Sequence, residues 1–441
     1  MNLNPGQLSA ISRIVEKVSA PNTAGEIPGI TLIGEGGTGK TTCIMQAVDQ
    51  LIQQGFTVLL TAPTNKAVKQ LIKSAREYGL PLSSVGFSTI HGALGLAMMP
   101  NEDRKSTFRA TEGILGNYDV VVVDEGSMLG RYVLEGYLIP ELQFLGIKVI
   151  LMGDDMQLPP IKETVSPCFT LFETLRLTKV ERFDANSGIG DLVRGIRSAI
   201  SEERPFKAPD EFGPGVEAVL PAHFIPLLKE HFVPGVDLDT HRVLAWSNRR
   251  VDELNRKIRE NIYGKNPDRF YPGERVVTGG PVKRGDVTLL GTDEECEVVQ
   301  YRVSTIEEQS TGLEFTAYQL ILQPLHTEDN KRVMVNILHE DAEDDFEVEL
   351  ERRARVARNA PREHVGRAWG AFWNLKNLVS DIRYCYCITV HRSQGSTFDH
   401  TFVDIKDILR NKIRSERQRL LCVACSRPRH KLYLNKQGFI G

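Results

Sequence analysis

The feature that most constrains this chain is a glycine-rich stretch, Gly34-Glu35-Gly36-Gly37-Thr38-Gly39-Lys40-Thr41. An apolar run at residues 30–33 precedes it, and a helix-like run at residues 42–53 follows it. A strand, a turn and a helix in this order are the context in which G-x-x-x-x-G-K-[ST] becomes a phosphate site. Glycines let successive backbone N–H groups point at one polyanion, and the helix N-terminus adds partial positive charge. The stretch therefore predicts a site for a nucleoside triphosphate.

Two side chains of this stretch have predicted chemical roles. Lys40 is expected to reach the β- and γ-phosphates, and the Thr41 hydroxyl is expected to ligate Mg²⁺. The remaining predicted nucleotide ligands are Gly34, Gly36, Gly37, Thr38, Gly39 and Thr42. The alternative is a chance glycine-rich turn, which an acidic partner further along the chain argues against.

That partner is the pair Asp124-Glu125, which directly follows a run of four valines at residues 120–123. A continuous β-branched run is typical of a strand covered on both faces. Asp124 is predicted to hold Mg²⁺ directly or through water, and Glu125 to act as general base or to orient the attacking water. The alternative is that the two acids cap a helix.

A second apolar run, at residues 149–152, leads into a loop that contains Gln157. We predict that Gln157 senses the γ-phosphate, against the alternative of a plain loop that ends in proline. All these motifs follow predicted strands, and ligands bind at the carboxyl ends of strands in open α/β sheets.

Length and composition limit the class of protein. A chain of 441 residues with 41% hydrophobic residues predicts two or three domains. No run approaches the ~18 apolar residues of a membrane span, so no membrane partner is expected. The seven scattered cysteines predict reduced thiols and a cytoplasmic location. The net charge of −3 argues against a coat of positive charge but leaves room for a locally basic groove.

Other segments are less specific when taken singly. Gln7 lies just inside a predicted amphipathic helix, and the residues alone favour a surface glutamine over one that reads an adenine edge. The loops at residues 61–65 and 88–92 follow strands and carry small polar groups suited to phosphate or sugar contacts, although each alone favours a plain turn. Residues 94–112 predict a polar excursion from the sheet, either a hairpin or a surface loop.

The second half of the chain predicts another α/β unit with an insert. Residues 202–239 are rich in Pro and Gly and predict connecting structure, and the unit starts at residues 243–248. Residues 275–324 alternate apolar and polar positions, which predicts antiparallel strands. The charge run at residues 338–367 predicts a solvated face. Trp246 is equally consistent with a core residue and with a platform for base stacking.

The order of these motifs resembles that of the superfamily 1 DNA helicases of the RecD-like branch, over nearly the whole chain. The resemblance makes Gln7 the glutamine that reads adenine. It makes residues 34–41 motif I, residues 124–128 motif II, residues 153–160 motif III, Arg182 the arginine of motif IV, residues 389–396 motif V and residues 421–429 motif VI. It implies that Arg182 and Arg427 face the γ-phosphate and that Gly395 lines the nucleotide.

The resemblance also implies an α/β architecture of two RecA-like P-loop NTPase domains. Residues 1–176 would form the ATP-binding domain, with a β-hairpin pin near residues 94–112. Residues 177–274 and 377–441 would form the second domain, and residues 275–376 an SH3-like β insert. DNA contacts are implied for Pro63, Thr64, Asn65, Thr89, His91, Phe108, Trp246, Asn248, Thr389 and His391.

The implied activity is ATP-dependent translocation on single-stranded DNA in the 5′ to 3′ direction, with separation of duplex DNA. The expected cofactors are ATP and Mg²⁺, and the expected partners are single-stranded and forked DNA and single-strand-binding or replication proteins of a phage or bacterium. The alternatives are an ATP-switched nucleic-acid-binding module and an RNA remodeller. Glu35 and Pro428 depart from the family pattern: Pro428 lacks a backbone donor beside Arg427, and Glu35 stands where small or apolar residues are usual.

Overall fold

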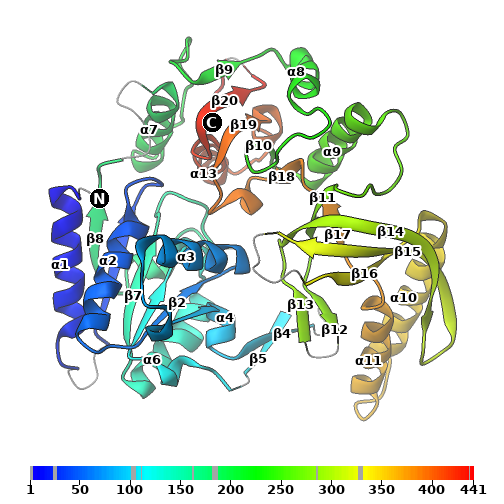
Figure 1. Ribbon diagram of the computed structural model, residues 1–441, viewed down its shortest axis with the longest axis horizontal. Helices are drawn as coiled ribbons and strands as arrows, with labels where there is room; N and C mark the ends of the chain where they lie inside the picture. Colours follow the sequence, from blue (N-terminus) through cyan, green and yellow to red (C-terminus); the bar gives the residue numbers. More distant parts are fainter. Residues whose placement is uncertain are drawn as a thin grey trace. The chain divides into compact units, whose positions relative to one another are not determined.

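The computed structural model describes residues 3–22, 27–100, 106–110, 112–160, 163–180, 187–284, 287–325, 331–436 and 438–441, with the backbone alone at 97–100 and 106–110. The chain divides into two compact units. Unit 1 contains the residues up to 100, residues 106–262 and residues 386–441, and unit 2 contains residues 263–385. Unit 1 holds two parallel sheets (Figure 1), and we call the parts built on them lobe 1 and lobe 2.

Lobe 1 is built on a six-stranded sheet in the order β3-β2-β6-β7-β1-β8, in which every neighbouring pair is parallel. Its strands are β1 (Gly29–Gly34), β2 (Val58–Ala62), β3 (Val85–Thr89), β6 (Val120–Val123), β7 (Lys148–Gly153) and β8 (Glu173–Leu177). Its helices are α1 (Pro5–Ser19), α2 (Lys40–Gln53), α3 (Asn65–Tyr78), α4 (Ile90–Ala93), α5 (Arg131–Val133) and α6 (Ile139–Leu145).

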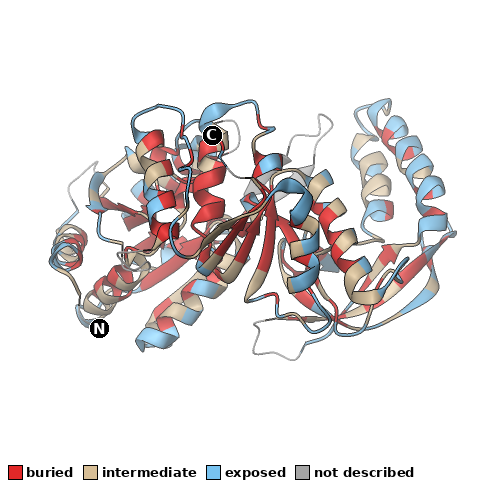
Figure 2. Ribbon diagram, turned by 90° about the horizontal axis from the view of Figure 1, so that it is seen from above, coloured by how far each residue is buried: buried red, intermediate tan, exposed pale blue. Residues whose placement is uncertain are grey.

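Both faces of this sheet are covered by apolar side chains. One core cluster joins the sheet to α1, α2 and α3, and a second cluster joins it to α4, α5 and α6. The valines of β6 alternate between the two clusters, which explains their continuous β-branched run. Figure 2 shows the resulting buried strands in red. Because all the strands are parallel, their carboxyl ends lie along one edge of the sheet.

Lobe 2 is built on a five-stranded parallel sheet in the order β18-β10-β19-β20-β9. Its strands are β9 (Val216–Ala218), β10 (His241–Ala245), β18 (Cys387–Thr389), β19 (Phe398–Val403) and β20 (Pro428–Leu434). Its helices are α7 (Gly188–Ser201), α8 (Phe224–His231), α9 (Asn248–Tyr263), α12 (Ile405–Ile408) and α13 (Arg414–Cys425). Neighbouring strands β10 and β18 lie on either side of the insert in sequence, with Val243 beside Cys387.

One predicted boundary and one predicted connecting segment differ in the structure. Strand β8 pairs with β1, so lobe 1 extends through Leu177 rather than ending at 176. The predicted connecting segment at residues 202–239 in fact contains edge strand β9 and helix α8. Strand β9 has only three residues, all half-exposed, so it leaves no apolar pattern in the sequence.

A β-hairpin leaves lobe 1 within the predicted excursion at residues 94–112. Strands β4 (Leu96–Pro100) and β5 (Ser106–Ala110) pair in antiparallel fashion, with Met98 opposite Phe108. The hairpin is therefore present where the sequence predicted one of two forms, while its role as a pin stays a prediction.

Unit 2 carries an antiparallel sheet in the order β16-β15-β14-β11-β17 and a separate hairpin, β12-β13. Its strands are β11 (Arg275–Thr278), β12 (Val282–Arg284), β13 (Val287–Leu290), β14 (Glu295–Glu308), β15 (Leu313–Pro324), β16 (Val333–Leu338) and β17 (Ile382–Tyr384). Strand β17 pairs with β11, so the compact unit reaches beyond the predicted limit of 376.

The charge run at residues 338–367 is largely helical. It forms α10 (Glu343–Arg358) and the start of α11 (Val365–Lys376), which pack against each other. Arg353 of α10 is buried and donates to Glu308, to Glu349 and to the carbonyl of Ala371. Part of the run therefore faces inward, contrary to the predicted solvated face.

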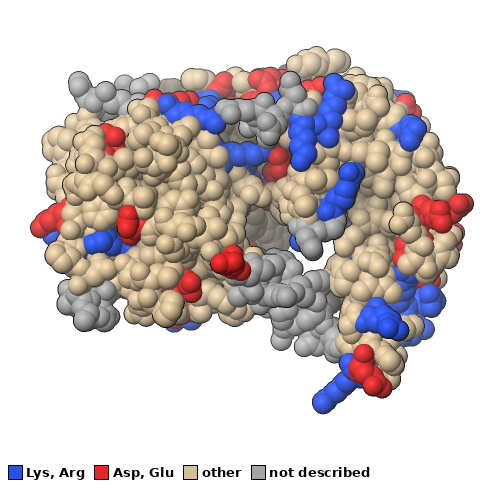
Figure 3. All heavy atoms as spheres, turned by 60° about the horizontal axis from the view of Figure 1, so that its bottom comes forward, with Lys and Arg blue, Asp and Glu red and all other residues tan. Residues whose placement is uncertain are grey.

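Charged residues of both signs are distributed over the surface. Figure 3 shows Lys and Arg in small groups on the face it draws, interspersed with Asp and Glu and separated by uncharged residues. Among the helices of the described residues, none combines the length and the apolar character that crossing a membrane requires.

Candidate functional site

The conformation of the phosphate loop of lobe 1 depends on two of its glycines. Gly37 and Gly39 have φ angles of 90° and 83°, a left-handed conformation that favours glycine. A Cβ on Gly39 would also collide with the side-chain amide of Gln7. The Thr38 hydroxyl donates to the Glu35 carbonyl at 2.8 Å and closes the loop. Helix α2 begins at Lys40, so its N-terminal N–H groups and partial positive charge lie at the loop.

Lys40 and Gln7 are both bonded to this loop. The Nζ of Lys40 donates to the carbonyls of Gly34 and Glu35, at 2.7 and 3.1 Å. Gln7 is buried, and its Nε2 donates to the carbonyl of Thr38 at 3.1 Å, while its Oε1 accepts from the backbone N–H of Asn4. The surface position that the residues alone favoured for Gln7 is thus wrong. One N–H and one lone pair of the amide remain for a ligand, so adenine recognition stays a prediction.

Asp124 and Glu125 lie at the carboxyl end of β6. Burial raises the pKa of Asp124 to about 7, and the charge of Glu125 adds to the effect. Burial also raises the pKa of Glu125, against the opposing charges of Lys40 and Arg427. Glu125 has a φ of 50°, uncommon for a residue with a side chain. Glu125 stands at the N-cap position of a 3-10 turn (Gly126–Met128), but its side chain makes no capping hydrogen bond. Both carboxyls are desolvated and lie near the lysine of the phosphate loop.

Gln157 lies in the loop after β7, beside residues of lobe 2. Its Oε1 accepts from Nε2 of Gln394 at 3.5 Å, a long bond, and its own Nε2 lies at 3.5 Å from Oδ2 of Asp154. Arg419 of α13 holds the same loop more firmly, because its Nη1 donates to the carbonyls of Asp155 and Gln157 at 2.7 and 2.8 Å. The predicted sensor loop of lobe 1 is therefore tied to lobe 2.

Arg427 follows α13 and is almost completely buried, with 4% of its surface exposed. Its guanidinium donates to the carbonyls of Val423, Ser393 and Ser396 and to the Ser426 hydroxyl. Burial lowers the pKa of Arg427, and the charge of Glu125 opposes the change. Pro428 begins β20, and the side chain of Arg427 is fixed by these bonds despite the missing backbone donor.

The motif V glycine joins this arrangement from lobe 2. Gly395 has a φ of 71°, and a Cβ placed on it would lie 3.6 Å from Oε1 of Glu125. Residues of both lobes therefore meet at Glu125: Lys40 and Arg427 lie near enough for their charges to act on it, and Gly395 lies beside it. Thr41 and Thr42 lie half-exposed in the first turn of α2.

The predicted DNA residues of lobe 1 lie at neighbouring strand ends. Ala62 of β2 is the register partner of Thr89 of β3. Thr64 caps α3 by accepting from the N–H of Ala67, and Thr89 caps α4 by accepting from the N–H of Gly92. The hydroxyls of both threonines thus have structural partners. The other predicted contacts at this edge are Pro63, Asn65 and His91.

The predicted DNA residues of lobe 2 also share a sheet edge, because Ala245 of β10 is the register partner of Thr389 of β18. Trp246 is half-exposed, and its backbone N–H donates to the Asp407 carboxylate at 3.0 Å. It is therefore not a fully buried core residue. Asn248 and His391 are exposed. The hydroxyl of Thr389, a buried residue, accepts from the N–H of Arg392.

Two predicted residues cannot be placed as side chains. Arg182 lies outside the described residues, and Phe108 is described by its backbone alone, on β5. Two arginines that the sequence did not single out lie in the site. Arg419 holds the Gln157 loop, and Arg197 of α7 contacts Asp154 and Glu35. Each shares its helix with other arginines, so neither stands out from its neighbours as a site residue.

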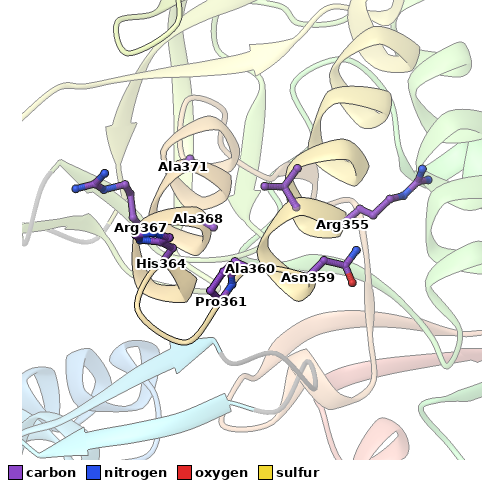
Figure 4. A pocket seen from close by; sticks show the side chains of 9 residues that line it. Arg355, Asn359, Ala360, Pro361, His364, Arg367, Ala368 and Ala371 are labelled. Carbon is purple, nitrogen blue, oxygen red and sulfur yellow. The ribbon is translucent and has the colours of Figure 1, made fainter.

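A groove of about 630 Å³ lies in unit 2 and includes none of the predicted site residues. Figure 4 shows its lining along the end of α10 and the start of α11, with an apolar floor and the polar side chains of Arg355, Asn359, His364 and Arg367 around it.

The chain matches known proteins in the same regions. Residues 18–163 match a model described as an AAA domain, and residues 384–435 match a UvrD-like helicase C-terminal domain. The ATP-dependent DNA helicase dda of Enterobacteria phage T4 is 25% identical to this chain, over 98% of this chain and 99% of its own.

Solved structures share the fold at low identity. A structure of two Pif1 helicases at forked double-stranded DNA has a TM-score of 0.54 and 14% identity, covering 99% of this chain and 92% of that one. Bacteroides Pif1 with ADP-AlF3 and single-stranded DNA has a TM-score of 0.52 and 15% identity, covering 99% and 93%. The full-length similarity to the T4 protein, the two matched models and the shared fold make this chain similar to ATP-dependent DNA helicases.

Proposed function

We propose that this protein is an ATP-dependent DNA helicase that moves 5′ to 3′ along single-stranded DNA and separates duplex DNA. The observation that carries the proposal is that residues of both lobes meet at Glu125. Lobe 1 contributes Lys40 and Glu125, and lobe 2 contributes Gly395 and Arg427. Phosphoryl transfer requires these parts: a cradle for the phosphates, a group that positions water, and a cation opposite.

The site residues have distinct proposed roles. Lys40 binds the β- and γ-phosphates, and Glu125 accepts a proton from water or orients it with the help of Gln157. Arg427 neutralises charge on the γ-phosphate from lobe 2. Thr41 and Asp124 supply oxygen ligands of the kind that Mg²⁺ prefers, and Mg²⁺ typically uses one or two protein ligands beside phosphates and waters. That ion would supply charge neutralisation on the phosphates.

Closure of the lobes would be converted into movement along DNA. Arg427 and Arg182 attract the γ-phosphate while it is present and lose that partner after hydrolysis, so the lobes approach and separate in turn. The edges that carry Thr64 and Thr89 in lobe 1 and Trp246 and His391 in lobe 2 would grip the strand alternately.

Energetics decide what the hairpin can contribute. Opening a base-pair step requires about 1.4 kcal/mol, whereas stacking on an aromatic side chain such as Phe108 returns about 1–3 kcal/mol. A pin can therefore bias a junction, but repeated steps need ATP hydrolysis.

Relatives support the substrate class. The T4 relative is named an ATP-dependent DNA helicase, and the Pif1 structures are described with single-stranded and forked DNA. The polarity, a phage or bacterial role in replication or recombination, and single-strand-binding or replication protein partners are part of our proposal. None of the seven cysteines, all of which the structure describes, forms a disulfide, which supports a reducing, cytoplasmic location.

Strand displacement on forked DNA tests the proposal. We expect ATP-dependent displacement from a duplex with a 5′ single-stranded tail and none from a duplex with only a 3′ tail. The reverse preference would contradict the polarity. DNA-stimulated ATPase without displacement would select the switched binding module, and stronger stimulation by RNA than by DNA would select the RNA remodeller.

A further inference from the structure

An arginine of lobe 2 contacts the phosphate loop of lobe 1. Arg197 belongs to α7, which packs against α13 and β20 of lobe 2. Its Nη1 donates to both carboxylate oxygens of Asp154, at 3.0 and 2.9 Å, and its Nε lies 3.2 Å from Oε2 of Glu35. The side chains of Arg197, Glu35 and Asp154 are 11%, 13% and 3% exposed. This is a buried triad of two carboxylates and one guanidinium.

The two carboxylates differ in how well they are satisfied. Asp154 also accepts from the N–H of Met156, and its pKa is lowered by Arg197 despite burial. Glu35 has Arg197 as its one ion-pair partner among the described residues, and burial raises its pKa. Of the two, Glu35 is therefore the weaker ligand of Arg197 and the one that another anion would displace.

Glu35 is also the residue of the phosphate loop that departs from the small or apolar residues usual there. A carboxylate in a loop that receives a triphosphate lowers affinity by like-charge repulsion unless a cation neutralises it. The neutralising cation comes from the other lobe, so the pair links the lobes through the position where phosphate is expected.

We propose that Glu35 acts as an internal competitor for the γ-phosphate, and that Arg197 exchanges Glu35 for the γ-phosphate when ATP binds. This inference rests on the proposed function, because it requires ATP at the loop. It makes Arg197 a residue that distinguishes ATP from ADP. Asp154 retains its contacts to Arg197 and keeps the guanidinium directed at the loop during the exchange.

The test is equilibrium binding of fluorescent ADP and of a fluorescent, non-hydrolysable ATP analogue to the full-length protein. The variants are Glu35→Gln, Arg197→Ala and the double variant. The control is Arg204→Ala, since Arg204 follows the same helix, is 48% exposed and pairs with Glu202. Loss of a hydrogen bond to a charged group predicts about 10- to 100-fold weaker binding of the ATP analogue to Arg197→Ala, with ADP binding changed much less.

The double variant separates exchange from simple repulsion. We expect Glu35→Gln to tighten binding of the ATP analogue more in the wild-type background, where it frees Arg197 for the γ-phosphate, than in the Arg197→Ala background, where it removes only the repulsion by Glu35. Equal tightening for ADP and the ATP analogue, or the same tightening in both backgrounds, would overturn the exchange. An unchanged ratio of the two affinities in Arg197→Ala would reduce the triad to a structural ion pair.

A folding control keeps the result interpretable. If Arg197→Ala does not fold by circular dichroism, Arg197→Lys retains the charge but loses the fork that contacts two carboxylates, and it should still weaken the ATP analogue relative to ADP. A lysine variant with an unchanged ratio would contradict the inference. No variant has to hydrolyse ATP or separate strands in this test. Wild-type protein that binds no nucleotide would therefore contradict the proposed function. If the wild type prefers the ATP analogue to ADP and the variants keep the same preference, only this inference is contradicted.

Discussion

The Glu125 carboxylate of lobe 1 lies beside Gly395 of lobe 2, close enough that a Cβ on Gly395 would be 3.6 Å from Oε1 of Glu125. That separation is an ordinary van der Waals contact, so an alanine at 395 would not collide. Its φ of 71°, however, is left-handed and strains any residue with a Cβ. A backbone that relieves the strain would move relative to Glu125.

We therefore expect Gly395→Ala to lower kcat for DNA-stimulated ATP hydrolysis by about tenfold, the equivalent of ~1.4 kcal/mol. Gly235→Ala is the matched control, because Gly235 has a φ of 84° and nothing within contact of an added Cβ. Both variants should lose similar thermal stability. Steady-state ATPase assays that find equal kcat losses in both would assign the effect to general strain rather than to the Glu125 contact.

Lys40→Ala should abolish DNA-stimulated ATP hydrolysis. Lys40 is the cation of the phosphate loop, and removal of one preorganised electrostatic contact typically reduces kcat by about 10²–10³. Single-stranded DNA binding, measured by fluorescence anisotropy without nucleotide, should remain. Lys73→Ala, on α3 with 67% of its side chain exposed, serves as a control for loss of a lysine alone. Full ATPase activity in Lys40→Ala would exclude this loop as the hydrolytic site.

Phe108→Ala should weaken strand separation while sparing ATP hydrolysis and translocation on single-stranded DNA. The prediction rests on the position of Phe108 in hairpin strand β5 and on the value of aromatic stacking, about 1–3 kcal/mol per base. Displacement assays on forked DNA, run beside a translocation assay, measure the two separately. Thr107→Ala is the neighbouring control. Parallel loss of all three activities in Phe108→Ala would argue against a pin.

Unit 2 should lose stability at acid pH through Glu308. Arg353, Ser310 and Thr311 hydrogen-bond to its carboxylate and lower the pKa of Glu308 from 4.5 to about 2. A carboxyl with a lowered folded-state pKa stabilises fully above its unfolded pKa, and the contribution disappears as pH falls from about 4.5 towards 2. At 1.36 kcal/mol per unit, the contribution is on the order of 3 kcal/mol.

Arg353→Met should destabilise unit 2 at neutral pH and flatten this dependence. Breaking a buried ion pair typically costs about 3–5 kcal/mol. Thermal melts followed by tryptophan fluorescence report on this unit, because Trp369 and Trp373 lie on α11. Arg352→Met is the control: Arg352 is 62% exposed, and its ion pair is expected to contribute less than about 1 kcal/mol. Melts that respond equally to the two substitutions would contradict the prediction.

The sequence predicted those parts of the site that depend on local pattern. The phosphate loop and the Asp124-Glu125 pair each combine an apolar strand with a polar turn, and that combination requires no knowledge of distant residues. Gln157 was predicted from the polar loop that follows an apolar run, and Arg427 from the order of motifs. The structure places Arg427 near enough to Glu125 for the two charges to interact, while its contact with the γ-phosphate stays a prediction. Gln7 needed the family resemblance, because its burial depends on the phosphate loop some thirty residues later.

What could not be predicted depends on partners that are remote in sequence. Arg197 pairs with Asp154 and Glu35, and Arg419 binds the loop of Gln157, so neither has a local signature. The charge run at residues 338–367 hid a helix whose inward positions include Phe346, Arg353 and Ala357. An arginine on the inner face breaks the apolar stripe from which amphipathic helices are recognised.

The insertion of unit 2 between β10 and β18 has a mechanical consequence. Those strands are neighbours in the lobe 2 sheet, so the chain leaves one of them through α9 and returns from β17 directly into the other. A force on unit 2 would thus pass along the backbone to the segment that carries Thr389, His391 and Gly395, and Gly395 lies beside Glu125. The same short backbone segment would then both carry the mechanical force and line the proposed ATP site.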